Sequence, residues 1–138
     1  MTTRPSFEVR QQVIRRAANH CEYCRLHQDF AASAHQVDHI IAEKHGGPTT
    51  ADNLALSCTT CNRRKGSDIG AIDPEAQELV RLYNPRTQRW DDHFRVEDAS
   101  IVGITPEGRA TVELLRLNSY ERIAERAELI RAGRYPGT

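Results

Sequence analysis

The sequence predicts a single α+β domain, and three observations lead to that fold class. At 138 residues the chain has the usual length of one domain. Two short apolar segments are separated by a turn-rich stretch, whereas the flanking segments carry apolar residues at helical spacing. All four cysteines fall in two Cys-x-x-Cys pairs that bracket the two apolar segments. At 38% hydrophobic residues the core is modest, so a cross-link at the cysteines would add needed stability.

The first half of the chain is predicted to contain helix, strand, loop, strand and helix in that order. Ser6 can cap a helix over residues 7–19, whose apolar side chains recur every three or four positions. Residues 34–41 and 54–56 are the predicted strands, because β-branched and aliphatic residues dominate them. A helix over residues 59–66 follows the second cysteine pair and ends near a glycine.

The second half is predicted to form an extension with helix, strand, helix and helix. Residues 74–82 begin with proline and carry apolar residues compatible with a short helix. Residues 100–104 are a predicted strand, and a Thr-Pro-Glu start predicts a helix over residues 106–117. A last helix follows from residue 120 to a stop at Gly133. We divide the chain into a module of residues 1–68 and an extension of residues 69–138 that packs on it within one domain.

The charge of the chain is balanced overall but not along its length. It has 19 Lys and Arg against 19 Asp and Glu, which argues against a protein that coats nucleic acid by bulk electrostatics. Residues 1–66 carry nine cations and six anions, and residues 67–138 carry ten and thirteen, so the first half is the basic half. No apolar run reaches the length of a membrane span, and the N-terminus lacks the apolar region of a signal peptide. We expect a soluble, cytoplasmic protein without a membrane partner.

The two cysteine pairs predict a structural zinc site. Thiolates two residues apart can occupy adjacent corners of a tetrahedron, and two such turns complete four-coordinate zinc. Disulfides are the alternative, but an intracellular chain argues against them. A redox motif would explain one cysteine pair and leave the other pair unexplained. Iron bound by four thiolates is compatible with the same spacing. The predicted zinc ligands are Cys21, Cys24, Cys58 and Cys61.

Four polar residues between and beside the cysteine pairs predict a second site. Asp38 and His39 lie at the end of the first predicted strand, and Asn62 begins the helix after the last cysteine. A carboxylate and an amide oxygen suit a hard cation such as Mg²⁺, and His39 would be free to take a proton from water. Asn53 lies in the turn-rich loop between the strands.

The order of these residues resembles the HNH endonucleases, which have a ββα-metal (His-Me finger) fold, over about residues 7–68. By that resemblance His39 is the general base, and Asp38 and Asn62 hold a catalytic Mg²⁺ or Mn²⁺. Asn53 fixes the loop that positions His39, and the four cysteines bind structural zinc. The resemblance implies hydrolysis of DNA, most simply double-stranded, to 5′-phosphate and 3′-hydroxyl ends. Asn62 stands where many members carry histidine, which favours a hard metal.

Several cations are expected to contact the phosphate backbone. Lys65 would place positive charge beside the reacting phosphate. The segment of residues 84–90 resembles one that accompanies HNH modules in bacteria, and we expect it to pack Trp90 and Phe94 onto the core. The remaining candidate nucleic-acid contacts are Arg63, Arg64, Arg86 and Arg89.

Three functions are compatible with the sequence. The first is an HNH endonuclease. The second is a zinc-dependent module that binds nucleic acid or protein and has an idle nuclease site. The third is a redox protein that uses the cysteines. Retention of Asp38, His39, Asn53 and Asn62 together favours the first, and pairing of all thiols in one site disfavours the third.

Overall fold

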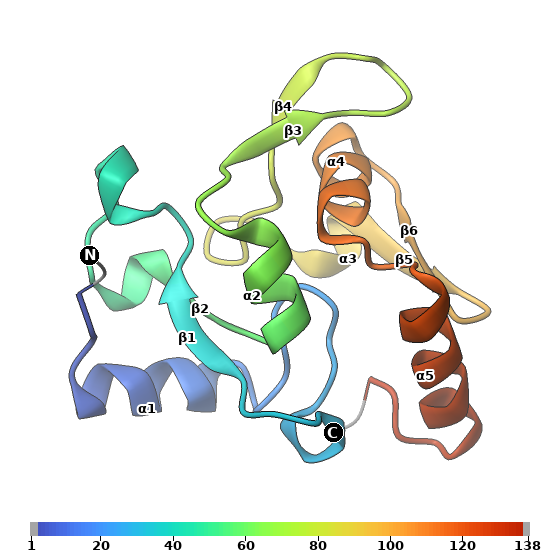
Figure 1. Cartoon of the computed structure of the whole chain (residues 1–138), viewed down its shortest axis with the longest axis horizontal. Coiled ribbons are helices and arrows are strands. Elements are labelled where there is room, and N and C mark those ends of the chain that lie inside the picture. The colour runs from blue at the N-terminus through green and yellow to red at the C-terminus, as the bar shows by residue number, and fades with distance from the viewer. Residues whose placement is uncertain (1–2, 137–138) are drawn as a thin grey trace.

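The fold, taken from a computed structural model that describes residues 3–136, is mixed α+β (Figure 1). Within those residues the strands form three separate antiparallel pairs, β1 with β2, β3 with β4 and β5 with β6. The helices are α1 (Phe7–Arg16), α2 (Thr59–Lys65), α3 (Trp90–His93), α4 (Pro106–Leu115) and α5 (Tyr120–Arg131). The strands are β1 (Gln36–His39), β2 (Leu54–Ser57), β3 (Gly70–Ile72), β4 (Leu79–Arg81), β5 (Phe94–Glu97) and β6 (Ser100–Gly103).

Helix α1 begins where the sequence predicts and ends earlier. The Ser6 hydroxyl accepts a hydrogen bond from the Val9 amide at 3.2 Å, which caps the first turn. The buried side chain of Val13 packs against β2. The helix stops at Arg16 because Ala18 and Asn19 adopt positive φ angles of 51° and 62°, which turn the chain toward the first cysteine pair.

Strands β1 and β2 form the hairpin predicted around the turn-rich loop. Their antiparallel register places Asp38 opposite Ala55 and His39 opposite Leu54. In Figure 1, β1 lies between α1 and α2, and it contacts both. Helix α2 follows β2 directly, and the Cys58 sulfur accepts a hydrogen bond from the Cys61 amide at its first turn. The strand–strand–helix order predicted for this region is confirmed.

The predicted helix over residues 74–82 is wrong. Both carboxylate oxygens of Asp73 accept backbone amides, one from Glu75 and the other from Ala76, so the chain makes a tight turn. Gln77 has a positive φ of 59°, and the chain then enters β4, which pairs with β3. The apolar spacing in this segment suited a helix, but the Asp73 turn satisfies the backbone differently.

The rest of the extension matches the predicted strand and two helices more closely. The Thr105 hydroxyl accepts the Gly108 amide at 3.0 Å and caps α4, which has Pro106 in its first turn. The helix ends at Leu115, before the predicted Leu117, because Arg116 adopts a left-handed conformation. Two hairpins and the short helix α3 were not anticipated, so the extension is not helix–strand–helix–helix.

The main core joins the two halves of the chain. Both cysteine pairs, Ile40 directly after β1, and Ala55 of β2 pack in one cluster. The same cluster contains Trp90, Phe94, Ile101 and Leu115 from the second half. The Trp90 indole donates a hydrogen bond to the Tyr23 carbonyl at 2.8 Å. The packing role predicted for Trp90 and Phe94 is confirmed. Among residues 3–136, no helix has the length and hydropathy needed to cross a bilayer.

Candidate functional site

The four cysteines meet in the core as a candidate structural zinc site. All four are buried and free, and their sulfur atoms lie within 4.8 Å of one another. Backbone amides donate to two of the sulfurs, Cys24 to Cys21 and Cys61 to Cys58, both at 3.4 Å. Such amide donors stabilise thiolates, and the sulfur spacing suits tetrahedral coordination with Zn–S bonds of about 2.3 Å. The donor set therefore fits zinc.

His39 is held at the end of β1 by the loop that follows it. Its ring is almost fully buried, and Nε2 lies 2.9 Å from the Thr49 hydroxyl and 3.6 Å from a Glu43 carboxylate oxygen. Its other nitrogen, Nδ1, lies 3.7 Å from Asp38 Oδ1, which is beyond hydrogen-bond distance. The two ring nitrogens therefore have different surroundings, one fixed by protein groups and one directed toward Asp38.

Asn53 fixes the start of the loop between β1 and β2. Its side-chain oxygen accepts the Ile41 amide at 3.0 Å, and its amide group donates to the carbonyls of Ile41 at 2.8 Å and Pro48 at 2.9 Å. Its own carbonyl accepts the Ile40 amide at 2.8 Å. Gly47, in the same loop, lies directly against the Ile41 carbonyl. A Cβ atom at this position would lie 1.8 Å from the Ile41 oxygen. Asn53 and Gly47 thus close the loop directly after His39.

A cleft of about 630 Å³ opens beside this histidine. Asp38 and His39 of β1 line it, together with Asn62 from the first turn of α2. The Asn62 amide donates to the Gln36 side-chain oxygen at 3.2 Å, and among residues 3–136 no donor occupies the Asn62 oxygen, which can therefore accept. The strand–strand–helix arrangement brings the three predicted residues to one cleft, and their catalytic and metal-binding roles stay predictions.

Lys65, the other predicted catalytic residue, lies away from this cleft. It is 6% exposed, and its ammonium group donates to the Ile40 carbonyl at 2.7 Å. Burial lowers its pKa, although the negative charges of Asp38 and Asp68 oppose that shift. In this arrangement Lys65 ties α2 to Ile40, directly after β1, and its charge interacts with that of Asp38, which lines the cleft.

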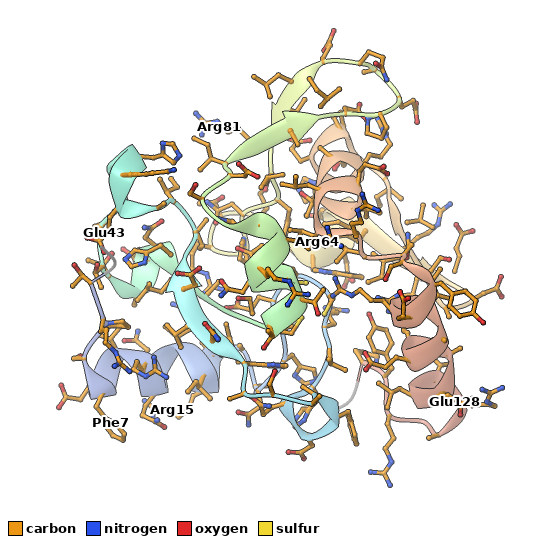
Figure 2. All side chains as sticks on the ribbon, viewed as in Figure 1. Phe7, Arg15, Glu43, Arg64, Arg81 and Glu128 are labelled. Atoms are coloured by element: carbon orange, nitrogen blue, oxygen red, sulfur yellow. The ribbon has the colours of Figure 1, made fainter. Side chains whose placement is uncertain are left out.

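The four arginines predicted to contact nucleic acid differ in their surroundings. Arg63 and Arg64 are exposed on α2, as Figure 2 shows for Arg64. Arg89 is also exposed, directly before α3. Arg86 instead forms an ion pair with Glu22, in which each side chain is 11% exposed. The first three can reach a phosphate from the surface, and Arg86 is engaged within the protein.

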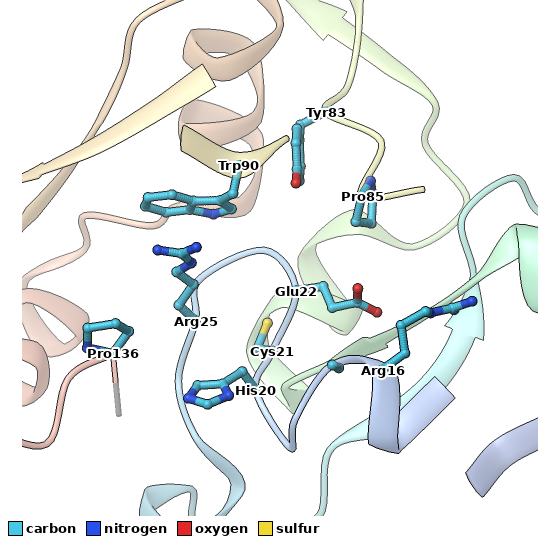
Figure 3. A pocket seen from close by; sticks show the side chains of 10 residues that line it. Arg16, His20, Cys21, Glu22, Arg25, Tyr83, Pro85, Trp90 and Pro136 are labelled. Atoms are coloured by element: carbon cyan, nitrogen blue, oxygen red, sulfur yellow. The ribbon is translucent and has the colours of Figure 1, made fainter. Parts of the chain in front are cut away.

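Glu22 and Trp90 lie around a second hollow, of about 310 Å³, that shares no lining residue with the cleft (Figure 3). The Glu22 carboxylate accepts the Leu56 amide at 2.9 Å, and burial raises its pKa against the opposing effect of that bond and of Arg86. On the other side, the Arg25 guanidinium lies 4.3 Å from the centre of the Trp90 ring. These contacts join the first cysteine turn to the extension.

Sequence reasoning missed four residues at or near the cleft. Thr49 and Glu43 approach His39 from the loop, and Arg4 and Arg10 line the cleft from the N-terminal segment and α1. The spacing of Glu43 four residues after His39 gave a weak signal. Arg10 carries no motif that marks it, and it reaches the cleft because α1 packs against β1. Thr49 has no distinguishing pattern around it.

The comparison with known families agrees with this geometry. Residues 21–68 match the family described as HNH endonuclease. This segment is an HNH endonuclease domain. It runs from the first cysteine pair through β1, β2 and α2, and so contains the whole cysteine cluster, His39, Asn53 and Asn62. The match does not include α1, α4 or α5.

One curated protein is similar over most of the chain. Septu protein PtuB of Bacillus thuringiensis is 23% identical over 117 residues, which cover 83% of this chain and 43% of that protein. The chain thus spans less than half the length of this relative. No solved structure gave a significant match. The similarity to PtuB extends beyond the HNH domain, because the domain alone is too short to account for 117 residues.

Proposed function

We propose that the protein is a metal-dependent endonuclease that hydrolyses DNA with the HNH domain. The observation that carries the proposal is the placement of His39, Asp38 and Asn62 around one cleft in a segment of that family. The fold we assign to the domain is the ββα-metal arrangement of β1, β2 and α2, with zinc at the four cysteines as a structural support.

His39 is the proposed general base. With its Nε2 proton donated to the Thr49 hydroxyl, Nδ1 carries the lone pair and faces the Asp38 side of the cleft. Nδ1 takes a proton from water, the water oxygen attacks the phosphorus, and the bond from phosphorus to the 3′ oxygen breaks. The products are a 5′-phosphate and, after the leaving oxygen takes a proton from solvent, a 3′-hydroxyl. Glu43, 3.6 Å from Nε2, favours the positive charge that His39 gains.

Asp38 and Asn62 are the proposed ligands of the catalytic Mg²⁺ or Mn²⁺. One carboxylate and one amide oxygen from the protein leave room for water and a phosphate oxygen, which is how Mg²⁺ is commonly held. When bound, the cation supplies charge stabilisation to the phosphate and the leaving oxygen. The protein residues position it through β1 and α2, which the zinc site and Lys65 hold together.

DNA is the proposed substrate, with a phosphate backbone contacted by arginines. Arg4 and Arg10 line the cleft, and Arg63 and Arg64 are exposed on the helix that carries Asn62. These cations concentrate positive charge at the site although the chain is neutral overall. Double-stranded DNA is the substrate to test first.

Plasmid cleavage with Mg²⁺ or Mn²⁺ tests the proposal directly. We expect His39→Ala to lower the cleavage rate by about 100-fold or more, the usual contribution of a general base. Zinc content, measured by mass spectrometry of the purified protein, should stay the same as in the wild type. The matched control is His45→Ala, because His45 is exposed in the same loop and lies outside the cleft.

Two results would contradict the proposal in different ways. Equal cleavage by wild type and His39→Ala would show that His39 is not the base. No cleavage of any DNA or RNA by wild type, together with binding in a gel-shift assay, would favour a binding module with an idle site.

A further inference from the structure

Arg122, in the first turns of α5, points its guanidinium at the cysteine cluster. One terminal nitrogen, Nη2, lies 3.1 Å from the Cys61 sulfur and 3.8 Å from the Cys58 sulfur. The other, Nη1, donates to the Leu115 carbonyl at 3.0 Å. Arg122 therefore joins the C-terminal helix to two predicted zinc ligands that lie about sixty residues earlier in the chain.

The charge of Arg122 has no carboxylate partner in the described part of the chain. None of the ion pairs between residues 3 and 136 includes it, although its side chain is half-buried. A partly desolvated guanidinium without an anion is costly. The sulfur atoms are the anions available to it.

We propose that Arg122 is the counter-ion of the zinc site and that α5 is part of the structure that retains the metal. Four thiolates outnumber the positive charges of Zn²⁺, so the buried site carries an excess of negative charge. A guanidinium that donates to two thiolates offsets part of that excess and holds them as thiolates. The inference rests on zinc binding by the four cysteines and is independent of nuclease activity.

Further contacts from the same region support the role of α5 as a cover of the cluster. Arg126, one turn after Arg122, is 4% exposed and donates to the carbonyls of Ala99 and Leu117 at 2.8 and 2.9 Å. Beyond the helix, the Tyr135 hydroxyl donates to the Cys24 carbonyl at 2.8 Å. The C-terminal segment thus contacts both cysteine pairs, which explains how residues outside the HNH domain can stabilise its metal site.

Zinc affinity of the full chain tests the inference. Apparent affinity is measured by competition with a chromogenic chelator, for wild type, Arg122→Gln, Arg122→Lys and the control Arg131→Gln. Arg131 lies on the same helix, is exposed and pairs with exposed Glu128. We expect Arg122→Gln to bind zinc about 10- to 100-fold more weakly, the usual effect of losing a partner of a metal ligand. The zinc affinity of Arg122→Lys should lie between those of Arg122→Gln and wild type, and the affinity of Arg131→Gln should equal that of wild type.

The possible failures are distinguishable. A wild-type chain that binds no zinc would refute the zinc site itself, and the inference with it. If the zinc affinity of Arg122→Gln is within twofold of that of the wild type, the role of Arg122 is refuted, but the zinc site is not. If Arg122→Gln does not fold, Co²⁺-loaded Arg122→Lys decides. Its sulfur-to-cobalt charge-transfer band should shift relative to wild type and Arg131→Gln, and an unchanged band would overturn the inference.

Discussion

Asn53 and the backbone of Ile41 form a reciprocal pair in which the side-chain amide replaces a strand partner. The Asn53 oxygen accepts the Ile41 amide at 3.0 Å, and the Asn53 nitrogen donates to the Ile41 carbonyl at 2.8 Å. Ile41 is two residues beyond His39, so this pair sets the direction in which the chain leaves β1. The position of His39 is thus coupled to a residue on the far side of the loop.

Replacing Asn53 with alanine should therefore impair both stability and activity. The change removes three side-chain hydrogen bonds from a buried position, and we expect a loss of about 2 kcal/mol in the free energy of unfolding. Plasmid cleavage should fall well beyond what the unfolded fraction explains, because the loop that holds His39 is released. Urea denaturation and cleavage assays on the same preparation measure the two effects.

Asn118 offers a matched control for Asn53. It brackets Ile101 in the same reciprocal way, with both hydrogen bonds at 2.8 Å, but it lies in the extension and outside the cleft. Asn118→Ala should destabilise the protein to a similar degree and leave the activity of the folded fraction intact. Equal loss of specific activity in both variants would show that Asn53 acts only through stability.

Two adjacent glycines in the loop should respond differently to alanine. At Gly47 a Cβ atom would lie 1.8 Å from the Ile41 oxygen and 2.7 Å from the Asn53 side-chain nitrogen, so the loop must move. At Gly46 the space is open, and the cost is only that of a positive φ of 92°, about 1 kcal/mol. Thermal denaturation should show a much larger drop in Tm for Gly47→Ala. A larger drop for Gly46→Ala would contradict the close approach of the loop.

Arg10 should contribute to DNA affinity from the flank of α1. In a His39→Ala background, which prevents cleavage, Arg10→Gln should weaken binding and reduce the slope of log K against log salt by about 1. Arg15→Gln is the control, because Arg15 lies on the same helix (Figure 2), is exposed, and does not line the cleft. Fluorescence anisotropy with a labelled duplex measures both. Equal salt slopes for the two variants would remove Arg10 from the proposed interface.

The Asp73–Arg109 ion pair should make stability depend on pH in acid. Arg109 donates to both carboxylate oxygens, at 2.9 and 2.8 Å, and these bonds are the main cause that lowers the pKa of Asp73 from 3.8 to about 2. Because the pKa is lower in the folded state, the pair stabilises the protein above about pH 4, and this contribution disappears as the pH falls toward 2. The difference in Tm between wild type and Asp73→Asn should be constant from pH 7 to 5 and narrow below pH 4. A constant difference throughout would show that the charge of Asp73 is not responsible.

The elements nearest the site were predictable because local signals agreed with one another. Ser6 and Thr105 cap the helices that the sequence assigns to them, and the two strands follow the apolar segments. The error over residues 74–82 arose where local signals conflict. The apolar spacing there suits a helix, and the side chain of Asp73 instead closes a turn. That turn is favoured further by the bond of Asp73 to Arg109, which lies 36 residues away.

The sequence indicated the role of some candidate residues but not the environment of others. The types and order of Cys21, Asp38, His39 and Asn62 indicated chemistry, because thiolates, carboxylates and imidazoles have few other reasons to occur in that pattern. The sequence did not reveal the environments of Lys65 and Arg86, because the identity of a cationic residue does not show whether it contacts a phosphate, a backbone carbonyl or a glutamate. Their partners, the Ile40 carbonyl and Glu22, are 25 and 64 residues away.

The sequence by itself determined the kind of domain and the chemistry it can support, because cysteine spacing and the short polar motif are local properties. The tertiary structure decided which charges face the cleft, which are buried, and that α5 brings Arg122 to the sulfurs of Cys58 and Cys61. The physical reason is that burial and pairing of a charge depend on the packing of distant segments, which a local pattern does not encode.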